Sequence, residues 1–387
     1  MNGVANLSLN ADSRVGTIAF IDLKAQQRRI RQAVEKRLQA VLDHGRYIAG
    51  PEIEELEEKL AERTGAAAAV SCASGTAALI IPLLAEGLDT GDAVFIPAFT
   101  YNATANAVLL TGATPVFVDI DPATFNMDAD DLERRIGEVR AEGKLRPRAV
   151  IPVDLFGSPA DYTRFETIAE REDLFLLSDG AQSFGGRLNG RWVGDLAPAT
   201  ATSFFPGKAF GAYGDAGAVF AHDKAMVDHW ASIRWHGTDN ARKDSIRVGF
   251  NGRMDTFQAA VLLEKLEIFD DELAARHEIA DVYSRRLSNI GRPQTHITGA
   301  QSGYGYYSLC VKNRDAVVSK VSAMGVPTAI YYAKPLHKMD AFAAFAPEGG
   351  LAQTERTADE IFALPMHPYL TPAQVDYICD AVEAAVS

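Results

Sequence analysis

The chain has 387 residues, of which 47% are hydrophobic and 23% are charged, and its formal net charge is −13 at pH 7. This composition is typical of a globular protein with a large core, and the length predicts two or three structural units. The negative charge argues against a nucleic-acid partner, although a local basic pocket could still bind a phosphorylated ligand.

Several features bear on the cell compartment and on metals. Cys72, Cys310 and Cys379 are scattered and form no CxxC pair, which predicts reduced core thiols and a cytoplasmic setting. Residues 1–16 lack an apolar stretch typical of a signal peptide. No apolar run approaches the roughly 20 residues that a membrane span needs, so we expect no membrane partner. The histidines show no metal-ligand spacing, and we expect no metal site.

The N-terminal part reads as a flexible tail over residues 1–16, followed by two helices. Helical periodicity with a charged face covers residues 23–43, and a short amphipathic helix is expected from Pro51 to near Gly65. Short apolar runs then alternate with helical segments. This alternation predicts an α/β domain with a mostly parallel sheet covered by helices. The expected strands are 67–71, 93–96, 115–118, 149–153, 174–177, 200–204 and 218–221, and the expected helices include 77–87, 130–142 and 159–172.

The pattern changes near Met254. Residues 255–287 are strongly helical and should lead out of the sheet domain. Beyond them, 304–311, 317–324, 328–332 and 372–386 read as strand, helix, strand and helix, with a loop over 335–350. We therefore expect a large domain over residues 17–262 and a small α+β domain over residues 263–387.

The stretch Ser203–Gly217, SFFPGKAFGAYGDAG, carries one lysine between an apolar run and a glycine-spaced loop. A lysine delivered into the interior on a tight turn loses its proton readily, because desolvation disfavours the ammonium form. The neutral amine is a nucleophile towards aldehydes and forms Schiff bases. The alternative for Lys208 is a surface lysine in a loop.

A carboxylate upstream favours the chemical interpretation. Asp179 stands at the end of the predicted strand 174–177, on the edge where open α/β sheets bind ligands. Pyridoxal phosphate (PLP) needs such a carboxylate to keep its pyridine nitrogen protonated, and a lysine for its aldehyde. The alternative for Asp179 is an ordinary turn or helix cap.

Two further segments fit a phosphorylated aromatic cofactor. Ser74, Gly75 and Thr76 open a helix, where free backbone amides bind phosphate, although an ordinary helix cap explains the same residues. Tyr101 follows the strand 93–96 and could stack on the pyridine, or it could simply pack in the core.

Together these residues lie in segments that resemble the DegT/DnrJ/EryC1 family of PLP-dependent aminotransferases, which make amino sugars on nucleotide carriers. The resemblance covers nearly the whole chain. The matching segments are CASGTAALI, PAFTYNATANAV, GATPVFVDIDP, IPVDLFG, SDGAQSFGG, SFFPGKAFGAYGDAGAVF, GFNGRMDTFQAAVLLEKL and IYYAKPLH. It implies the type I fold of PLP enzymes, with a seven-stranded sheet in the large domain.

The resemblance also implies roles for single residues. Lys208 matches the Schiff-base lysine and Asp179 the carboxylate on the pyridine nitrogen, which are the catalytic pair. Relatives that dehydrate sugars carry histidine in place of Lys208, so the lysine favours transamination. The other implied cofactor contacts are Gly75, Thr76 and Ser203 at the phosphate, Tyr101 at the ring, Gln182 at the phenolic oxygen, and Asn251 at the phosphate of a neighbouring subunit.

The substrate side rests on the same resemblance. It implies a homodimer with shared active sites, L-glutamate as amino donor, and a nucleotide-linked keto sugar as acceptor. The best match is C3 of a UDP-2-acetamido-3-keto-hexuronate, in surface polysaccharide (lipopolysaccharide) biosynthesis. The alternatives are an aminotransferase for another keto sugar or a cyclitol, or a PLP-binding regulator without turnover. The expected substrate contacts are Arg253, Tyr331, Tyr332 and His236, with Arg234 as a further diphosphate contact. Close uronate-specific relatives carry histidine where this chain has Tyr331.

Overall fold

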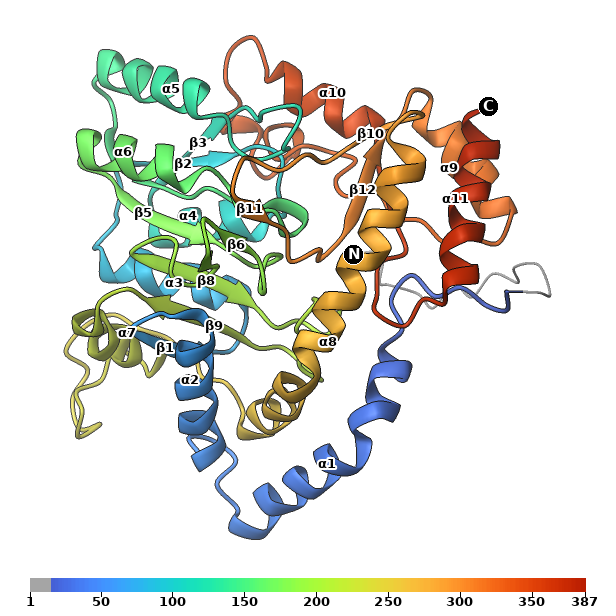
Figure 1. The fold of residues 1–387 in the computed structure, drawn as a ribbon. Coiled ribbons are helices and arrows are strands. Elements are labelled where there is room, and N and C mark those ends of the chain that lie inside the picture. The colour runs from blue at the N-terminus through green and yellow to red at the C-terminus, as the bar shows by residue number, and fades with distance from the viewer. Residues whose placement is uncertain (1–14) are drawn as a thin grey trace.

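The computed structural model describes residues 15–387, so the tail predicted for residues 1–16 lies almost entirely outside the described part (Figure 1). Residues 15–22 run along the small, C-terminal part of the molecule, and Ile18 is fully buried in its core. Among the helices of residues 15–387, none has the length and apolar character that a membrane crossing requires.

A seven-stranded sheet with the order β1-β9-β8-β5-β4-β2-β3 forms the centre of the large part. Only β9 is antiparallel to its neighbours, and the remaining pairs are parallel. The strands are β1 (Ala68–Cys72), β2 (Asp92–Pro97), β3 (Thr114–Val118), β4 (Arg146–Val150), β5 (Phe175–Asp179), β8 (Ala199–Ser203) and β9 (Gly217–Ala221). Each lies within a few residues of a predicted strand, and the expected α/β fold is confirmed.

Helices cover both faces of this sheet (Figure 1). One face packs against α3 (Gly75–Ala85), α4 (Ala103–Thr111) and α7 (Val227–Arg234). The other packs against α5 (Ala129–Glu142) and α6 (Tyr162–Glu172), and towards β1 against α2 (Pro51–Thr64). In β2, Val94 and Ile96 face the first layer, whereas Ala93 and Phe95 face the second. Burial on both faces explains why the strands are continuous apolar runs.

The helix α8 (Thr256–Leu287) runs from the sheet to the small part, and α1 (Leu23–His44) packs along it (Figure 1). Both helices were predicted. Their contact includes a buried hydrogen bond from Gln26 Nε2 to Glu272 Oε2 of 2.7 Å. The helix α8 continues through residue 262, where the large domain was expected to end, so the backbone shows no break at that point. The domain boundary at residue 262 stays a prediction.

The small part contains a second sheet, β10 (Arg292–Pro293), β12 (Tyr307–Cys310) and β13 (Ile361–Leu364), packed on α9 (Arg314–Ala323) and α11 (Pro372–Val386). The strand predicted over 328–332 is wrong, because only Ala329 makes a bridge, to Ala363. The outer strand is β13 instead, which follows α10 (Ala352–Glu360). A short sheet, β11 (Ala300–Gln301), β6 (Arg187–Leu188) and β7 (Arg191–Trp192), joins the two parts.

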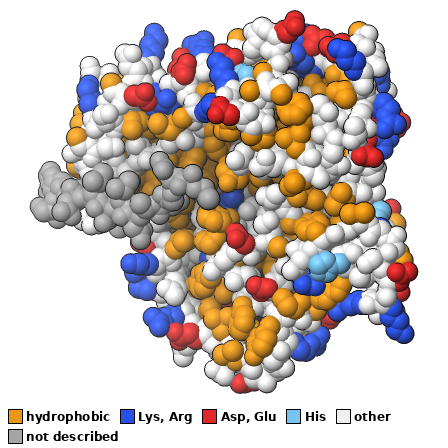
Figure 2. Space-filling model, turned by 180° about the vertical axis from the view of Figure 1, so that it is seen from behind, with side chains coloured by type: hydrophobic (Ala, Val, Ile, Leu, Met, Phe, Trp, Pro, Cys, Tyr) orange, Lys and Arg blue, Asp and Glu red, His pale blue; other side chains and the backbone are white. Residues whose placement is uncertain are grey.

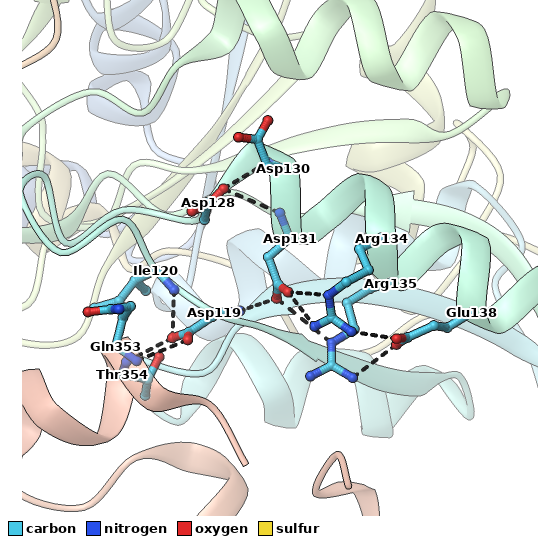
Figure 3. Close-up of polar contacts among 10 residues, drawn as sticks. All are labelled: Asp119, Ile120, Asp128, Asp130, Asp131, Arg134, Arg135, Glu138, Gln353 and Thr354. Atoms are coloured by element: carbon cyan, nitrogen blue, oxygen red, sulfur yellow. Dashed lines mark hydrogen bonds and ion pairs between the residues drawn. The ribbon is translucent and has the colours of Figure 1, made fainter. Parts of the chain in front are cut away.

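A single carboxylate fixes α10 to the large sheet. Asp119, directly after β3, accepts hydrogen bonds from the backbone amides of Gln353 (3.0 Å) and Thr354 (2.8 Å) at the start of α10 (Figure 3). The helix has no side-chain cap of its own at Leu351. The amide of Asp119 in turn donates to Asp131 Oδ2 at 2.7 Å. A cap from the large part therefore replaces the usual local one.

Replacing Asp119 with Ala should lower the free energy of unfolding by about 1–2 kcal/mol, because two amides of α10 lose their acceptor. Urea unfolding measures this change. Asp130→Ala is the control, since Asp130 is exposed and makes only a surface ion pair with Arg164 at 2.6 Å. Equal stability of the two variants would contradict the capping role.

Candidate active site

The carboxyl ends of β5 and β8 and the start of α3 lie together at one edge of the sheet. Asp179 is the last residue of β5 and pairs with Ala201 in the parallel neighbour β8, which ends at Ser203. Gly75 begins α3 and lies directly against Ser203. Parallel sheets bind ligands at this edge, since the strand ends leave a crevice there.

Asp179 is 4% exposed and accepts hydrogen bonds from Thr104 Oγ1 (2.8 Å) and from the amide of Ala181 (3.2 Å). Burial raises the pKa of its carboxyl group, and these two donors and the charge of Lys208 act against that rise. Its only hydrogen-bond donors among the described residues are neutral, so the carboxylate keeps accepting capacity for a cationic N–H group. Thr104 was missed from the sequence, where it is one of the two threonines in PAFTYNAT.

Lys208 lies in a closed turn after β8. Its amide donates to the carbonyl of Phe205 at 2.9 Å, and the amide of Ala212 returns to the carbonyl of Phe204 at 2.7 Å. Burial lowers the pKa of the Lys208 amine to about 8, although the nearby charge of Asp179 raises it. A substantial fraction of the amine is therefore neutral, and nucleophilic, near physiological pH. The alternative of a solvated surface lysine does not describe this residue.

A tight backbone cradle surrounds the start of α3. Ser74 caps the helix, with its Oγ accepting from the amide of Ala77 at 3.1 Å. A Cβ atom on Gly75 would lie 2.6 Å from Ser203 Cβ, and one on Gly217 would lie 2.6 Å from the backbone of Ser74. Glycine therefore permits this approach. The amides of Gly75 and Thr76, ahead of the capped Ala77, have no intrahelical acceptors, which makes them suitable for a phosphate.

An aromatic wall adjoins these groups. Tyr101 is 55% exposed, so core packing does not account for it, and its ring centroid lies 6.3 Å from that of Tyr332. Tyr331 lies next to Tyr332, with ring centroids 5.8 Å apart. Gln182 donates from Nε2 to the hydroxyl of Tyr332 at 3.0 Å. The wall therefore combines residues that follow strands of the large sheet with residues of the loop before α10.

Asn251 and Arg253 line a cavity of about 430 Å³ together with Ala73, Gly214 and Gln258. The amide of Ala73 donates to the carbonyl of Gly252 at 2.8 Å, which places this loop beside β1. The structure records no contact from Asn251 to Lys208 or Asp179 among the described residues of one chain. The prediction that Asn251 serves a neighbouring subunit stays a prediction.

His236 and Arg234, the two expected diphosphate contacts, differ in exposure and in hydrogen bonding. His236 is exposed and stays available to a ligand. Arg234 is not, because its Nη1 donates to Glu57 Oε1 and to the carbonyl of Ser71, both at 2.5 Å. These bonds tie α7 to α2 and β1 and count against a diphosphate role for Arg234, which stays a prediction.

The chemistry of these residues fits PLP. A buried carboxylate with accepting capacity suits a pyridine N–H, an amine with a lowered pKa suits an aldehyde, and a glycine-bearing helix start suits a phosphate. Asp179, Lys208 and the cradle of Gly75, Thr76 and Ser203 would hold these three parts of the cofactor. When bound, PLP supplies an electron sink for proton removal from the carbon that bears the amino group.

Residues 28–383 match the model of the DegT/DnrJ/EryC1/StrS aminotransferase family. The chain belongs to this family. It is 44% identical, over 94% of its length and 99% of the relative, to the UDP-2-acetamido-2-deoxy-3-oxo-D-glucuronate aminotransferase of Pseudomonas aeruginosa. A DegT/DnrJ/EryC1/StrS aminotransferase from Brucella abortus has a similar crystal structure, with a TM-score of 0.93 and 44% identity over 95% of this chain and 99% of that one.

A sugar aminotransferase of Streptococcus pneumoniae, described as putative and solved in its PLP form, superposes with a TM-score of 0.85. It is 25% identical over 92% of this chain and 96% of that one. The chain is thus a PLP-dependent aminotransferase, and the predicted family, fold and cofactor are confirmed. The roles of the single site residues stay predictions that the geometry supports.

The rate at which the apoprotein captures PLP should rise with pH through a midpoint near 8, because only the neutral amine of Lys208 attacks the aldehyde. An ordinary lysine would require a pH above about 10. Asp179→Asn should move the midpoint to lower pH, since the carboxylate that raises the amine pKa is removed. Visible absorbance of the bound cofactor follows the reaction.

Lys208→Ala is the control and should develop no visible band. Lys265 is also buried, and its pKa is also lowered to about 8, but its Nζ donates to the carbonyl of Gly211. A visible band in Lys208→Ala, or a midpoint near 10 in the unmodified protein, would contradict the assignment.

Proposed function

We propose that this aminotransferase transfers an amino group from L-glutamate to C3 of a UDP-linked 2-acetamido-3-keto-hexuronate, in surface polysaccharide biosynthesis. The observation that carries the proposal is the 44% identity, over 99% of the relative's length, to an aminotransferase named for such a 3-oxo-glucuronate. We place the reaction in the cytoplasm, and the three buried free cysteines support a reducing compartment.

Arg253 supplies a physical reason for an acidic sugar. Its guanidinium lies over the ring of Trp235, 4.5 Å from the centroid, which orients its plane. Arg253 Nε is buried without a hydrogen-bond partner among the described residues. A planar guanidinium with free donors can bind a carboxylate through two parallel hydrogen bonds, which a hydroxymethyl group cannot return. This favours a hexuronate over a neutral hexose.

In this proposal, the large part holds the cofactor and the aromatic wall holds the sugar. Tyr332 lies beside Tyr101 and Tyr331 beside Tyr332, and we assign His236 to the diphosphate. Lys208 Nζ would take up and return the proton at the substrate carbon that bears the amino group, a task that suits an amine whose pKa is about 8. The donor binds first, leaves as the 2-oxo acid, and the keto sugar receives the amino group.

We further propose a homodimer whose partner completes each site. Hydrophobic side chains gather across the middle of the face shown in Figure 2, and charged side chains lie mostly towards its rim. Such an apolar face is typical of a protein interface. Large apolar side chains exposed in the single chain include Tyr47, Ile48, Phe205, Tyr213, Ile246 and Val248. Ile48 lines the same cavity as Asn251 and Arg253, which supports an interface next to the site.

A subunit-mixing experiment tests the shared site. Lys208→Ala and Asn251→Ala should each be inactive or strongly impaired, and hybrid dimers of the two should regain one intact site, or about a quarter of the activity of the unmodified protein at equal mixing. Transamination of the mixture is measured after subunit exchange has been shown with tagged chains. No recovery in exchanged hybrids would contradict sharing through Asn251.

The preference for a carboxylate is tested with two acceptors, the 3-keto uronate and its uncharged 6-hydroxymethyl analogue. We expect kcat/KM for the uronate to be about 10- to 100-fold higher, and Arg253→Ala to remove most of this difference, as for loss of a charged hydrogen-bond pair. Arg253→Lys keeps the charge without the planar guanidinium, so its preference for the uronate should lie between that of the unmodified enzyme and that of Arg253→Ala. Equal efficiency of both acceptors in the unmodified enzyme would favour a neutral keto sugar or a cyclitol instead.

A further inference from the structure

A buried turn over residues 154–157 contacts both ends of the segment that carries Asp179 and Gln182. The amide of Asp154 donates to the carbonyl of Asp179 at 3.0 Å. The amide of Phe156 donates to the side-chain Oε1 of Gln182 at 2.8 Å. Asp154, Phe156, Asp179 and Gln182 are each at most 6% exposed, so water does not compete for these bonds.

The carboxylate of Asp154 also binds the residue at the end of this segment. It is fully buried and accepts hydrogen bonds from the amide of Ala160 (2.9 Å), the hydroxyl of Tyr162 (2.8 Å) and the hydroxyl of Ser183 (2.8 Å). Burial raises the pKa of Asp154 to about 7, and these three donors favour its ionised form. Ser183 directly follows Gln182, so the carboxylate holds the far end of the cofactor segment.

The direction of each proton follows from this arrangement. The hydroxyls of Ser183 and Tyr162 both donate to oxygens of the Asp154 carboxylate. Tyr162 must then accept from Ser178, whose Oγ lies 2.5 Å from the phenolic oxygen. Ser178 and Asp179 are successive strand residues and point to opposite faces of the sheet. Tyr162 therefore links Asp154 to Ser178 on β5, and Ser183 links it to the segment after Asp179.

The turn also fixes which way the Gln182 amide faces. Because the amide of Phe156 requires an acceptor, Oε1 must face the turn, and Nε2 must face Tyr332. One hydrogen atom of Gln182 Nε2 is donated to the Tyr332 hydroxyl, which leaves the second hydrogen atom of Nε2 for a ligand oxygen. Phe156 itself has φ +60, a conformation that a phenylalanine rarely adopts. Such backbone persists only where the surrounding structure determines it.

We propose that Asp154 is a positioning residue for the cofactor: through Ser183 and the 154–157 turn it holds Asp179 and Gln182 in the geometry that binds the pyridine ring. Asp154 is fully buried, and its carboxylate accepts from three donors of the protein itself. Its contribution reaches the reaction through the segment 179–183. The proposal concerns cofactor binding, so it does not depend on which sugar the enzyme uses.

Two matched variants separate positioning from general stability. Ser183→Ala and Tyr162→Phe each remove one hydroxyl donor from the same buried carboxylate, and the two losses should lower the melting temperature of the apoprotein similarly. Only Ser183→Ala breaks a bond within the segment 179–183, since the other bond of Tyr162 goes to Ser178 on the strand before it. Asp154→Asn is the third variant, since it keeps the shape and removes the charge. The readouts are the PLP dissociation constant, from titration of the apoprotein, and the pH midpoint of the visible band.

We expect Ser183→Ala and Asp154→Asn to weaken PLP binding by about tenfold or more and to shift the pH midpoint, and Tyr162→Phe to change affinity less than about threefold. The proposal is overturned if Ser183→Ala and Tyr162→Phe change PLP affinity by the same factor, or if Ser183→Ala binds PLP normally while melting earlier. Should Asp154→Asn not fold, the comparison of the other two variants still decides.

Discussion

Two ionisable groups that lie close together, the buried Asp179 and the partly buried Lys208, are the constraint on which this site depends. Burial disfavours the ionised forms of both Asp179 and Lys208, whereas their mutual attraction favours them. The amine is therefore close to losing its proton, and the carboxylate lacks a hydrogen-bonded cation among the described residues. A cofactor that offers an aldehyde to one group and a pyridine N–H to the other satisfies both, so an arrangement that is costly in the apoprotein becomes favourable on binding.

The parallel sheet is what brings these groups together. Asp179 and Ser203 end neighbouring strands in fixed register, and glycines at positions 75 and 217 allow α3 and β9 to approach them within van der Waals limits. The 154–157 turn, at the end of the next strand, then supports the segment after Asp179. Each functional side chain thus projects from the end of a rigid element, which keeps its geometry precise.

The small part contributes to the same site without supplying its catalytic pair. Tyr332 bonds Gln182, and Asp119 caps α10, so both ends of the loop between Ala329 and α10 are fixed to the large part. Arg276 on α8 donates to the carbonyls of Tyr304 and Met366 at 3.2 and 3.0 Å and so holds the small part to this helix. Tyr331 and Tyr332 pack against one hydrophobic cluster that joins the two parts, with Phe156 from the large part and Ile361 from the small part.

The sequence by itself determined the seven strands, the long helix near Thr256 and the pairing of Lys208 with Asp179, because apolar runs, glycine turns and motif spacing are local signals. It could not find Thr104, the tie of Arg234 to Glu57, or β13 in place of a strand at 328–332. Those depend on residues far apart in the chain. Whether Asp154 or Arg234 faces a ligand or a neighbouring side chain is decided by packing, since only tertiary structure sets which donors a buried polar group meets.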